Sequence, residues 1–67
     1  MKTYTIKEKD NLKKIAELFY NGDGDLWPNI QLANPGVDPN NLQIGTTINI
    51  PIPPNPSNRN SGDSTRL

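Results

Sequence analysis

The strongest constraint on the fold is that a segment of alternating side chains stands at each end of the well-patterned part of the chain. In KTYTI, residues 2–6, the tyrosine and the isoleucine share one side, and in TTINI, residues 46–50, the two isoleucines do so. An alternation with a period of two predicts a half-buried β-strand. Pro51 ends the second segment, because proline cannot extend the hydrogen-bonded ladder. The chain therefore has two candidate strands, far apart in sequence, that need a common core.

Two helices are predicted between these strands. The first has an apolar stripe at helical spacing, with Asp10 as the expected N-cap and Gly22 as the expected stop. The second is expected to be capped by Asp25, with Pro28 in its first turn, where the missing N–H costs little. The sequence Asn34-Pro35-Gly36 ends the second helix.

The order strand, helix, helix, strand predicts an α+β domain. We expect a two-stranded antiparallel sheet with both helices on one face, since two strands alone are marginal in water. The predicted core consists of Tyr4, Ile6, Leu12, Ile15, Ala16, Phe19, Trp27, Ile30, Ala33, Leu42, Ile48 and Ile50. The predicted domain covers residues 1–51, and residues 52–67, rich in Pro, Asn and Ser, form an extended C-terminal tail that has too little apolar surface to fold alone.

The composition excludes several classes of function. The 67 residues allow one small domain, which leaves little enclosed volume for an active site, so we do not expect an enzyme. The formal net charge is zero, which argues against general nucleic-acid binding. With neither cysteine nor histidine, the chain lacks thiolate and imidazole ligands for a metal. No apolar run is long enough for a signal peptide or a membrane span, so we expect synthesis in the cytoplasm and no membrane insertion.

Two acidic motifs could suggest chemistry, and neither does on inspection. The loop NGDGD begins like a calcium-binding EF-hand, but its twelfth position is Leu32, where calcium needs a bidentate Glu. Glu8 and Asp10 precede a helix in solvent, where nothing raises a carboxylate pKa to the range of an acid catalyst. No metal, no cofactor and no catalytic residue is therefore predicted.

The sequence resembles the LysM domain family over residues 2–51. The opening YTIKEKDNLKKIAELFYNG, the second-helix segment WPNIQLAN and the closing LQIGTTINIP follow the family pattern in order and spacing. The resemblance implies the same βααβ fold. It also implies non-catalytic binding of N-acetylglucosamine polymers, meaning peptidoglycan or chitin, in a shallow groove between two loops. Carried over by position, the groove residues are Lys9, Asp10, Asn11 and Leu12 on one wall and Asn34, Pro35, Gly36 and Ile44 on the other.

The sequence departs from the family pattern at two places on the first wall. The family has Gly-Asp-Thr where this chain has Lys9-Asp10-Asn11. Glycine allows a close approach of the backbone and a positive φ, whereas lysine adds a Cβ and a long charged side chain. Both replacements favour a role other than sugar binding.

The long loop between the helices, YNGDGDLWPNI, resembles the stand-alone LysM proteins of phage tails and contractile injection systems. The main hypothesis from sequence is thus a structural protein of a tail or baseplate, a joint between protein subunits that is incorporated into a virion or a similar particle. The alternative hypothesis is a module that binds peptidoglycan or chitin. For the structural role, the tail is expected to dock on a partner protein through Ile52, Arg59, Arg66 and Leu67.

Overall fold

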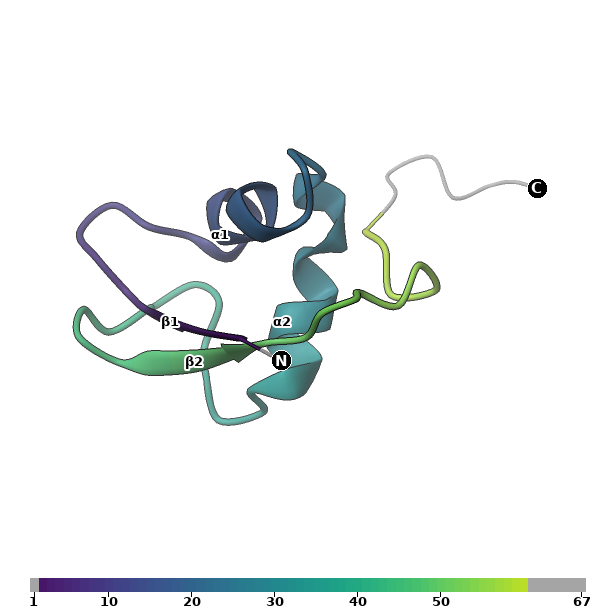
Figure 1. Ribbon diagram of the computed structural model, residues 1–67. Coiled ribbons are helices and arrows are strands. Elements are labelled where there is room, and N and C mark those ends of the chain that lie inside the picture. The colour runs from purple at the N-terminus through teal and green to yellow at the C-terminus, as the bar shows by residue number, and fades with distance from the viewer. Residues whose placement is uncertain (1, 61–67) are drawn as a thin grey trace.

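The computed structural model describes residues 2–60, and Figure 1 shows two strands and two helices in the predicted order. The strands are β1, Lys2–Thr5, and β2, Thr47–Ile50. The helices are α1, Leu12–Phe19, and α2, Trp27–Ala33, and a short 3₁₀ helix, η1, covers Gly24–Leu26 directly before α2. The predicted α+β class and the βααβ order are confirmed, with η1 as an addition that the sequence pattern did not indicate.

The two strands form one antiparallel sheet, as predicted. Lys2 lies opposite Ile50 and Thr5 lies opposite Thr47. The pairing continues past the strands, because Ile6 donates its N–H to the Thr46 carbonyl at 2.9 Å and Gly45 donates to the Ile6 carbonyl at 2.8 Å. These bonds hold the start of the β1–α1 loop against the end of the α2–β2 loop.

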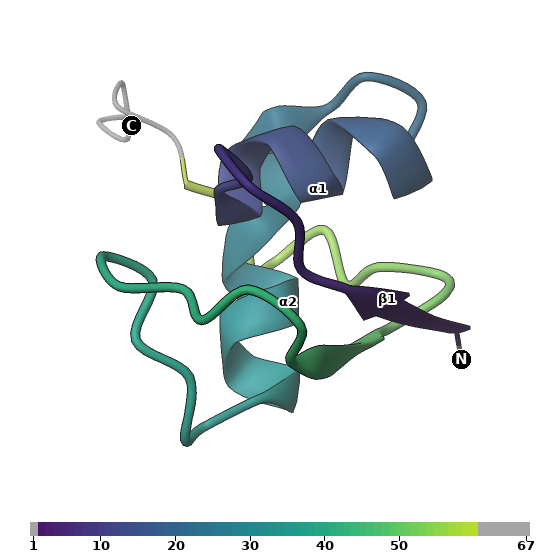
Figure 2. The ribbon, with the colours of Figure 1, turned by 90° about the vertical axis from the view of Figure 1, so that its left-hand side faces the viewer.

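The core lies between the two helices and one face of the sheet (Figures 1 and 2). It consists of Ile6, Leu12, Ile15, Ala16, Tyr20, Leu26, Ile30, Ile48 and Ile50. Around it pack half-buried apolar residues, namely Tyr4, Phe19, Trp27, Val37 and Leu42. The side chains of β2 alternate between exposed and buried, so the predicted inward direction of Ile48 and Ile50 is confirmed.

Tyr20 and Leu26 are buried although they were not in the predicted core. Helix α1 ends at Phe19, and Asn21 then adopts a left-handed conformation with a φ of 54°. This turn directs the Tyr20 ring inward, where its hydroxyl donates to the Pro51 carbonyl at 2.9 Å. Leu26 enters the core because η1, an element without a clear sequence signature, places it there.

Both predicted helix caps are wrong. Asn11 caps α1, because its Oδ1 accepts the Lys14 N–H at 2.8 Å, while Asp10 is turned back toward β1. Asp25 lies inside η1, and α2 begins with no capping side chain. Its first turn is continuous with η1, and Pro28 occupies it as predicted. The predicted stop at Gly22 holds in part, since the Gly22 N–H donates to the Glu17 carbonyl at 2.9 Å and closes the end of α1.

Residues 51–60, called the C-terminal segment below, run beside α2 and η1 (Figure 1). The buried side chain of Asn29 holds the segment to α2. Its Oδ1 accepts the Asn55 N–H at 2.9 Å, and its Nδ2 donates to the carbonyls of Asn55 and Asn58 at 3.2 and 3.3 Å. A boundary at residue 51 stays a prediction, but the segment that follows it contacts the domain as far as Asn60.

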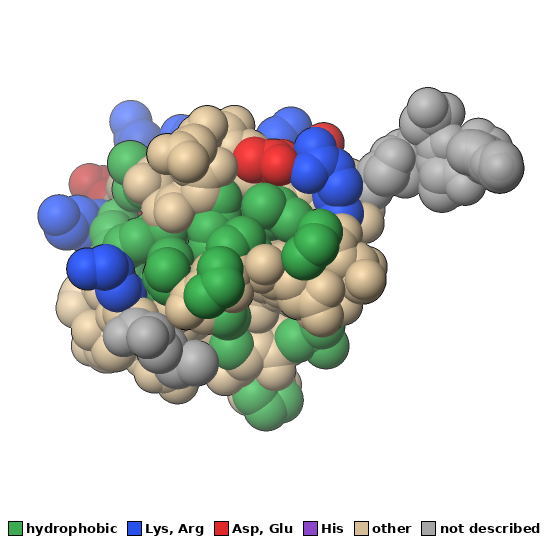
Figure 3. Space-filling view, turned by 45° about the vertical axis from the view of Figure 1, so that its right-hand side comes forward, with side chains coloured by type: hydrophobic (Ala, Val, Ile, Leu, Met, Phe, Trp, Pro, Cys, Tyr) green, Lys and Arg blue, Asp and Glu red, His purple; other side chains and the backbone are tan. Residues whose placement is uncertain are grey.

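Apolar side chains are not confined to the interior. Figure 3 shows hydrophobic side chains gathered over the middle of one face of the molecule. The large exposed ones in the described residues are Leu18, Leu32, Ile44 and Ile52. A core of nine buried apolar residues is small for one domain. We therefore expect modest stability, since small domains bury a small share of their surface.

Candidate functional site

The β1–α1 loop, residues 6–11, is held in shape by the Asp10 carboxylate. Asp10 Oδ2 accepts the Tyr4 hydroxyl at 2.7 Å and the Lys7 N–H at 2.8 Å. The hydrogen bond from Tyr4, with smaller contributions from Lys7 and Lys14, holds the pKa of Asp10 below its ordinary value. The same hydrogen bond, together with burial and the nearby negative charge, raises the pKa of Tyr4. Asp10 is therefore a structural residue of the loop in its charged form.

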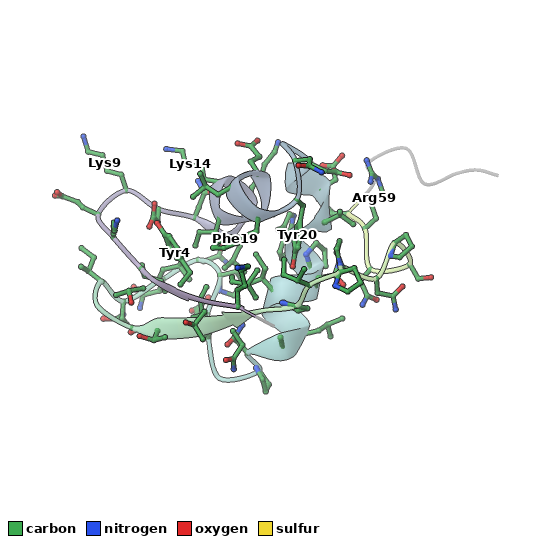
Figure 4. All side chains as sticks on the ribbon, viewed as in Figure 1. Tyr4, Lys9, Lys14, Phe19, Tyr20 and Arg59 are labelled. Atoms are coloured by element: carbon green, nitrogen blue, oxygen red, sulfur yellow. The ribbon has the colours of Figure 1, made fainter. Side chains whose placement is uncertain are left out.

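Lys9 is the residue of this loop that has a positive φ. Its φ is 67°, in the left-handed region that glycine adopts without steric cost. The Lys14 ammonium donates to the Lys9 carbonyl at 3.5 Å. Figure 4 shows the Lys9 and Lys14 side chains projecting outward at this end of the molecule. The backbone thus takes the shape that a glycine would favour, although the residue is lysine.

The α2–β2 loop, residues 34–46, is anchored at its start by Asn34. This buried side chain donates to the carbonyls of Ile30 at 2.7 Å and Asn49 at 2.9 Å, and it accepts the Asn49 N–H at 2.9 Å. These three bonds connect the end of α2 to the middle of β2. Asn34 therefore fixes where the loop begins rather than offering its side chain to a ligand.

The middle of the same loop is a tight turn around Pro39. Asp38 Oδ1 accepts the Asn40 N–H at 2.9 Å, and the Asp38 carbonyl accepts the Asn41 N–H at 3.0 Å. Aspartate followed by proline favours such a turn, because proline fixes φ and the aspartate side chain bonds the backbone ahead of it. The turn fixes the positions of Pro39 and Asn40.

A groove lies where this turn approaches the start of α1. It has a volume of about 330 Å³, and it is lined by Asn11, Leu12, Lys13, Trp27, Pro39 and Asn40. Three of these residues are apolar and three are polar, so the groove offers both flat apolar surface and hydrogen-bonding amides. Its two sides are the start of α1 and the α2–β2 loop, the latter seen at the left of Figure 2.

A second cavity of about 310 Å³ lies on the same loop. It is lined by Ile6, Gly36, Val37, Asp38, Asn41, Gln43 and Thr46. This cavity has no aromatic residue and includes the Asp38 carboxylate. It is less suited to the apolar face of a sugar than the groove that includes Trp27 and Pro39.

The structure brings part of the predicted first wall into the groove. Asn11 and Leu12 line it, while Lys9 and Asp10 lie in the loop that leads to it. Sequence reasoning did not assign Lys13, Pro39 or Asn40 to the site, and it treated Trp27 mainly as a core residue. The Asp38-Pro39 turn was the available signal for the missed wall.

The predicted second wall is not brought together. Asn34 is buried in the connection to β2, Pro35 is exposed, and Gly36 lines the second cavity. Ile44 is 68% exposed and lines neither cavity. The assignment of these residues to a binding groove stays a prediction, and the geometry favours Pro39 and Asn40 as the opposing wall.

The residues predicted to dock on a partner protein lie in different surroundings. Ile52 is 39% exposed. Arg59 forms ion pairs within the chain, with Asp23 and more distantly with Asp25, and Figure 4 shows it at the η1 end of the molecule. Arg66 and Leu67 lie outside the described residues.

In the part of the chain that the structure describes, no cluster of metal-ligating side chains and no membrane-spanning helix is found. Among residues 2–60, no three acidic side chains come together in a way that could hold a metal ion. In the same residues, neither helix combines the length and the hydrophobicity that a membrane crossing requires.

The comparisons with known proteins agree with this geometry. The LysM domain family model matches residues 4–51. Among solved structures, the crystal structure of the LysM domain from Volvox carteri chitinase is similar, with a TM-score of 0.56 and 42% sequence identity over 75% of this chain and 94% of that one. No curated protein matches. The family match covers most of the chain, and the similar structure has the same architecture, so the chain belongs to the LysM domain family.

Proposed function

We propose that the protein is a non-catalytic module that binds N-acetylglucosamine polymers, of the peptidoglycan or chitin type, in the groove between the start of α1 and the α2–β2 loop. The observation that carries the proposal is the lining of that groove, in which Trp27, Leu12 and Pro39 stand beside the amides of Asn11 and Asn40. Family membership supports it. So does the likeness to a LysM domain taken from a chitinase.

The chemistry of the groove suits an acetylated sugar. The faces of a pyranose ring are apolar and pack against flat apolar side chains, which aromatic residues and proline provide. An acetamide group carries one N–H donor and one carbonyl acceptor. The side-chain amide of Asn40 carries both kinds of group, and Asn11, whose Oδ1 caps α1, can donate through its Nδ2.

The interpretation as a tail or baseplate protein has less support. It rests on the likeness of the inter-helix loop, and none of the comparisons matches a tail protein. One residue assigned to partner docking, Arg59, is paired with acidic groups of its own chain. We therefore favour the carbohydrate-binding function. Synthesis in the cytoplasm and incorporation into a particle stay predictions from the sequence.

The test is a titration with N-acetylglucosamine oligomers of increasing length. Backbone amide shifts report on the groove through Leu12 and Asn40, and fluorescence reports on Trp27. We expect saturable changes at micromolar to low millimolar ligand. If the amides of these residues stay unmoved at saturating oligomer, the proposal is wrong.

A pair of exposed variants locates the site. Asn40→Ala removes an amide from the groove, and Gln43→Ala removes one from the second cavity. Loss of a hydrogen bond to a ligand costs about 0.5–1.5 kcal/mol, so Asn40→Ala is expected to weaken binding by about two- to tenfold. Gln43→Ala is expected to leave binding unchanged. If Gln43→Ala weakens binding and Asn40→Ala does not, the ligand binds in the second cavity.

A further inference from the structure

We propose that the C-terminal segment, residues 51–60, acts as a strap that positions Trp27, so that this end of the domain is coupled to the groove. In the described chain, residues of this segment line neither the groove nor the second cavity. Any effect on the groove must therefore pass through η1 and the first turn of α2. The consequence for ligand affinity rests on the proposed carbohydrate-binding function, whereas the position of Trp27 does not.

The peptide group that joins Leu26 to Trp27 is held at both of its polar atoms. The N–H of Trp27 donates to the Gly24 carbonyl at the end of η1. The carbonyl of Leu26 accepts a hydrogen bond of 3.2 Å from Nδ2 of Asn29. Because this peptide group begins α2, and α2 has no capping side chain, these two bonds help to fix the direction in which the Trp27 side chain leaves the backbone.

The C-terminal segment sets the orientation of the Asn29 amide. Asn29 is 3% exposed, and its Oδ1 accepts the Asn55 N–H at 2.9 Å. Its Nδ2 faces the carbonyls of Asn55 and Asn58 as well as that of Leu26. If the segment detaches, water reaches this amide and competes with the Leu26 carbonyl for Nδ2, since bonds within the protein are then exchanged for bonds to water.

A second anchor joins the end of the segment to η1. The Asn60 N–H donates to the Asp25 carbonyl at 2.6 Å, and Asp25 lies in η1. The Arg59 guanidinium, seen at the η1 end of the molecule in Figure 4, pairs with the carboxylate of Asp23, which directly precedes η1. Since Trp27 directly follows η1, the segment holds the element before Trp27 as well as the helix that Trp27 begins.

The expected effect on affinity is moderate. Leu26 belongs to the core, so it keeps η1 near its place when the segment detaches. Trp27 is half-buried, so part of its side chain lies outside the core and depends on the backbone for its direction. A side chain that is free to move must be ordered when a ligand binds, and ordering one such side chain lowers affinity by about two- to tenfold.

The first experiment follows Trp27 in the full chain without ligand. It is the single tryptophan of the sequence, so tryptophan fluorescence reports on this residue alone. Asn55→Pro removes the N–H that bonds Asn29, and Asn55→Ala keeps it, while both lose the bond from the Ser57 N–H to the Asn55 side chain. We expect Asn55→Pro to shift the emission to the red and to speed its quenching by acrylamide, and Asn55→Ala to leave both unchanged.

Amide exchange in the same samples shows which contacts are lost. In Asn55→Pro we expect the Asn60 N–H to lose its protection, while the Ile6 and Gly45 N–H groups, which bond across the ends of the strands, keep theirs. If the Asn60 N–H stays protected, the bond between Asn55 and Asn29 does not hold the segment and the inference is wrong.

A charge reversal tests the second anchor without adding a proline. Arg59→Glu places a third carboxylate beside those of Asp23 and Asp25, and Arg59→Glu combined with Asp23→Arg restores a pair of opposite charges. We expect Arg59→Glu to shift the Trp27 emission in the same direction as Asn55→Pro, and the double variant to return it toward the native value. If the double variant does not restore the emission, the pair is not an anchor for Trp27.

The second experiment is a titration of the same variants with an N-acetylglucosamine oligomer. We expect Asn55→Pro to bind about two- to tenfold more weakly than the native chain, and Asn55→Ala to bind equally well. If the native chain binds no oligomer, the proposed function is wrong, and the emission of Trp27 still decides whether the segment positions it. If neither Asn55→Pro nor Arg59→Glu changes the emission, the inference about the segment is wrong and the carbohydrate-binding function stands.

Discussion

Replacing Lys9 by glycine is expected to stabilise the domain. Lys9 has a φ of 67°, and a left-handed conformation costs an ordinary L-residue about 1–2 kcal/mol. Glycine removes that cost but loses about 0.5–1 kcal/mol more than alanine through its greater freedom in the unfolded chain. The midpoints of these two ranges differ by about 0.75 kcal/mol, so we expect a net gain of about 0.5–1 kcal/mol. The bond from Lys14 to the carbonyl of residue 9 remains possible, since at residue 9 it uses only the backbone.

Thermal and urea unfolding, followed by circular dichroism, measure this gain. For a domain of this size, about 0.5–1 kcal/mol corresponds to a rise in Tm of about 2–8 °C. Lys9→Ala is the matched control, because it removes the same charge and keeps the Cβ, and its stability is expected to stay within about 0.5 kcal/mol of the native protein. If Lys9→Gly is no more stable than Lys9→Ala, the loop does not hold residue 9 in a strained conformation and the reasoning fails.

Three other substitutions test the hydrogen bonds that shape the fold. Asn29→Ala is expected to lower the free energy of unfolding by about 1–3 kcal/mol, because it removes at least two hydrogen bonds between α2 and the C-terminal segment, each worth about 0.5–1.5 kcal/mol. Amide exchange measures this loss, and undiminished protection in the C-terminal segment would contradict it. Tyr20→Phe removes the hydroxyl that donates to the Pro51 carbonyl and is expected to lower the free energy of unfolding by about 0.5–1.5 kcal/mol. Urea unfolding measures this loss, and an unchanged midpoint would show that the bond contributes nothing to stability. The pKa of Asp10 is lower in the folded chain than in the unfolded one, so its stabilising contribution is present above the unfolded pKa and is lost as the pH falls through the folded pKa. Tyr4→Phe removes the main cause of that lowering, so an NMR titration is expected to show a higher midpoint for Asp10 and a smaller loss of stability in acid; an unmoved midpoint would assign the shift to the lysines instead.

The sequence was sufficient for the elements whose pattern is local. The alternation in the strands and the stripe from Leu12 to Phe19 predicted β1, β2 and α1 to within one or two residues. It was insufficient where two neighbouring residues compete for one role. Asp10 and Asn11 are both good N-caps, and the contact with Tyr4, which comes from another element, decides that Asn11 takes the cap.

The site was harder to predict than the fold, for a related reason. Asn11 and Leu12 lie at the start of a helix, and the resemblance to the LysM family assigned them to the groove by position. Pro39 and Asn40 reach the groove only because the loop that carries them is anchored at Asn34 and turned at Asp38. Such a path depends on contacts between distant residues, and the hydrophobic pattern of the sequence does not record it.

The small sheet has a consequence for how copies of this domain behave at high concentration. In the described part of the chain the sheet has two strands, so each has an edge that could recruit a strand from another molecule. Each strand is only four residues long, Lys2 stands at the start of β1, and Pro51 directly follows β2. Short strands, an edge lysine and a flanking proline all discourage pairing between molecules. We therefore expect that crowding the domain, as many copies on one polymer would, does not lead to β-aggregation.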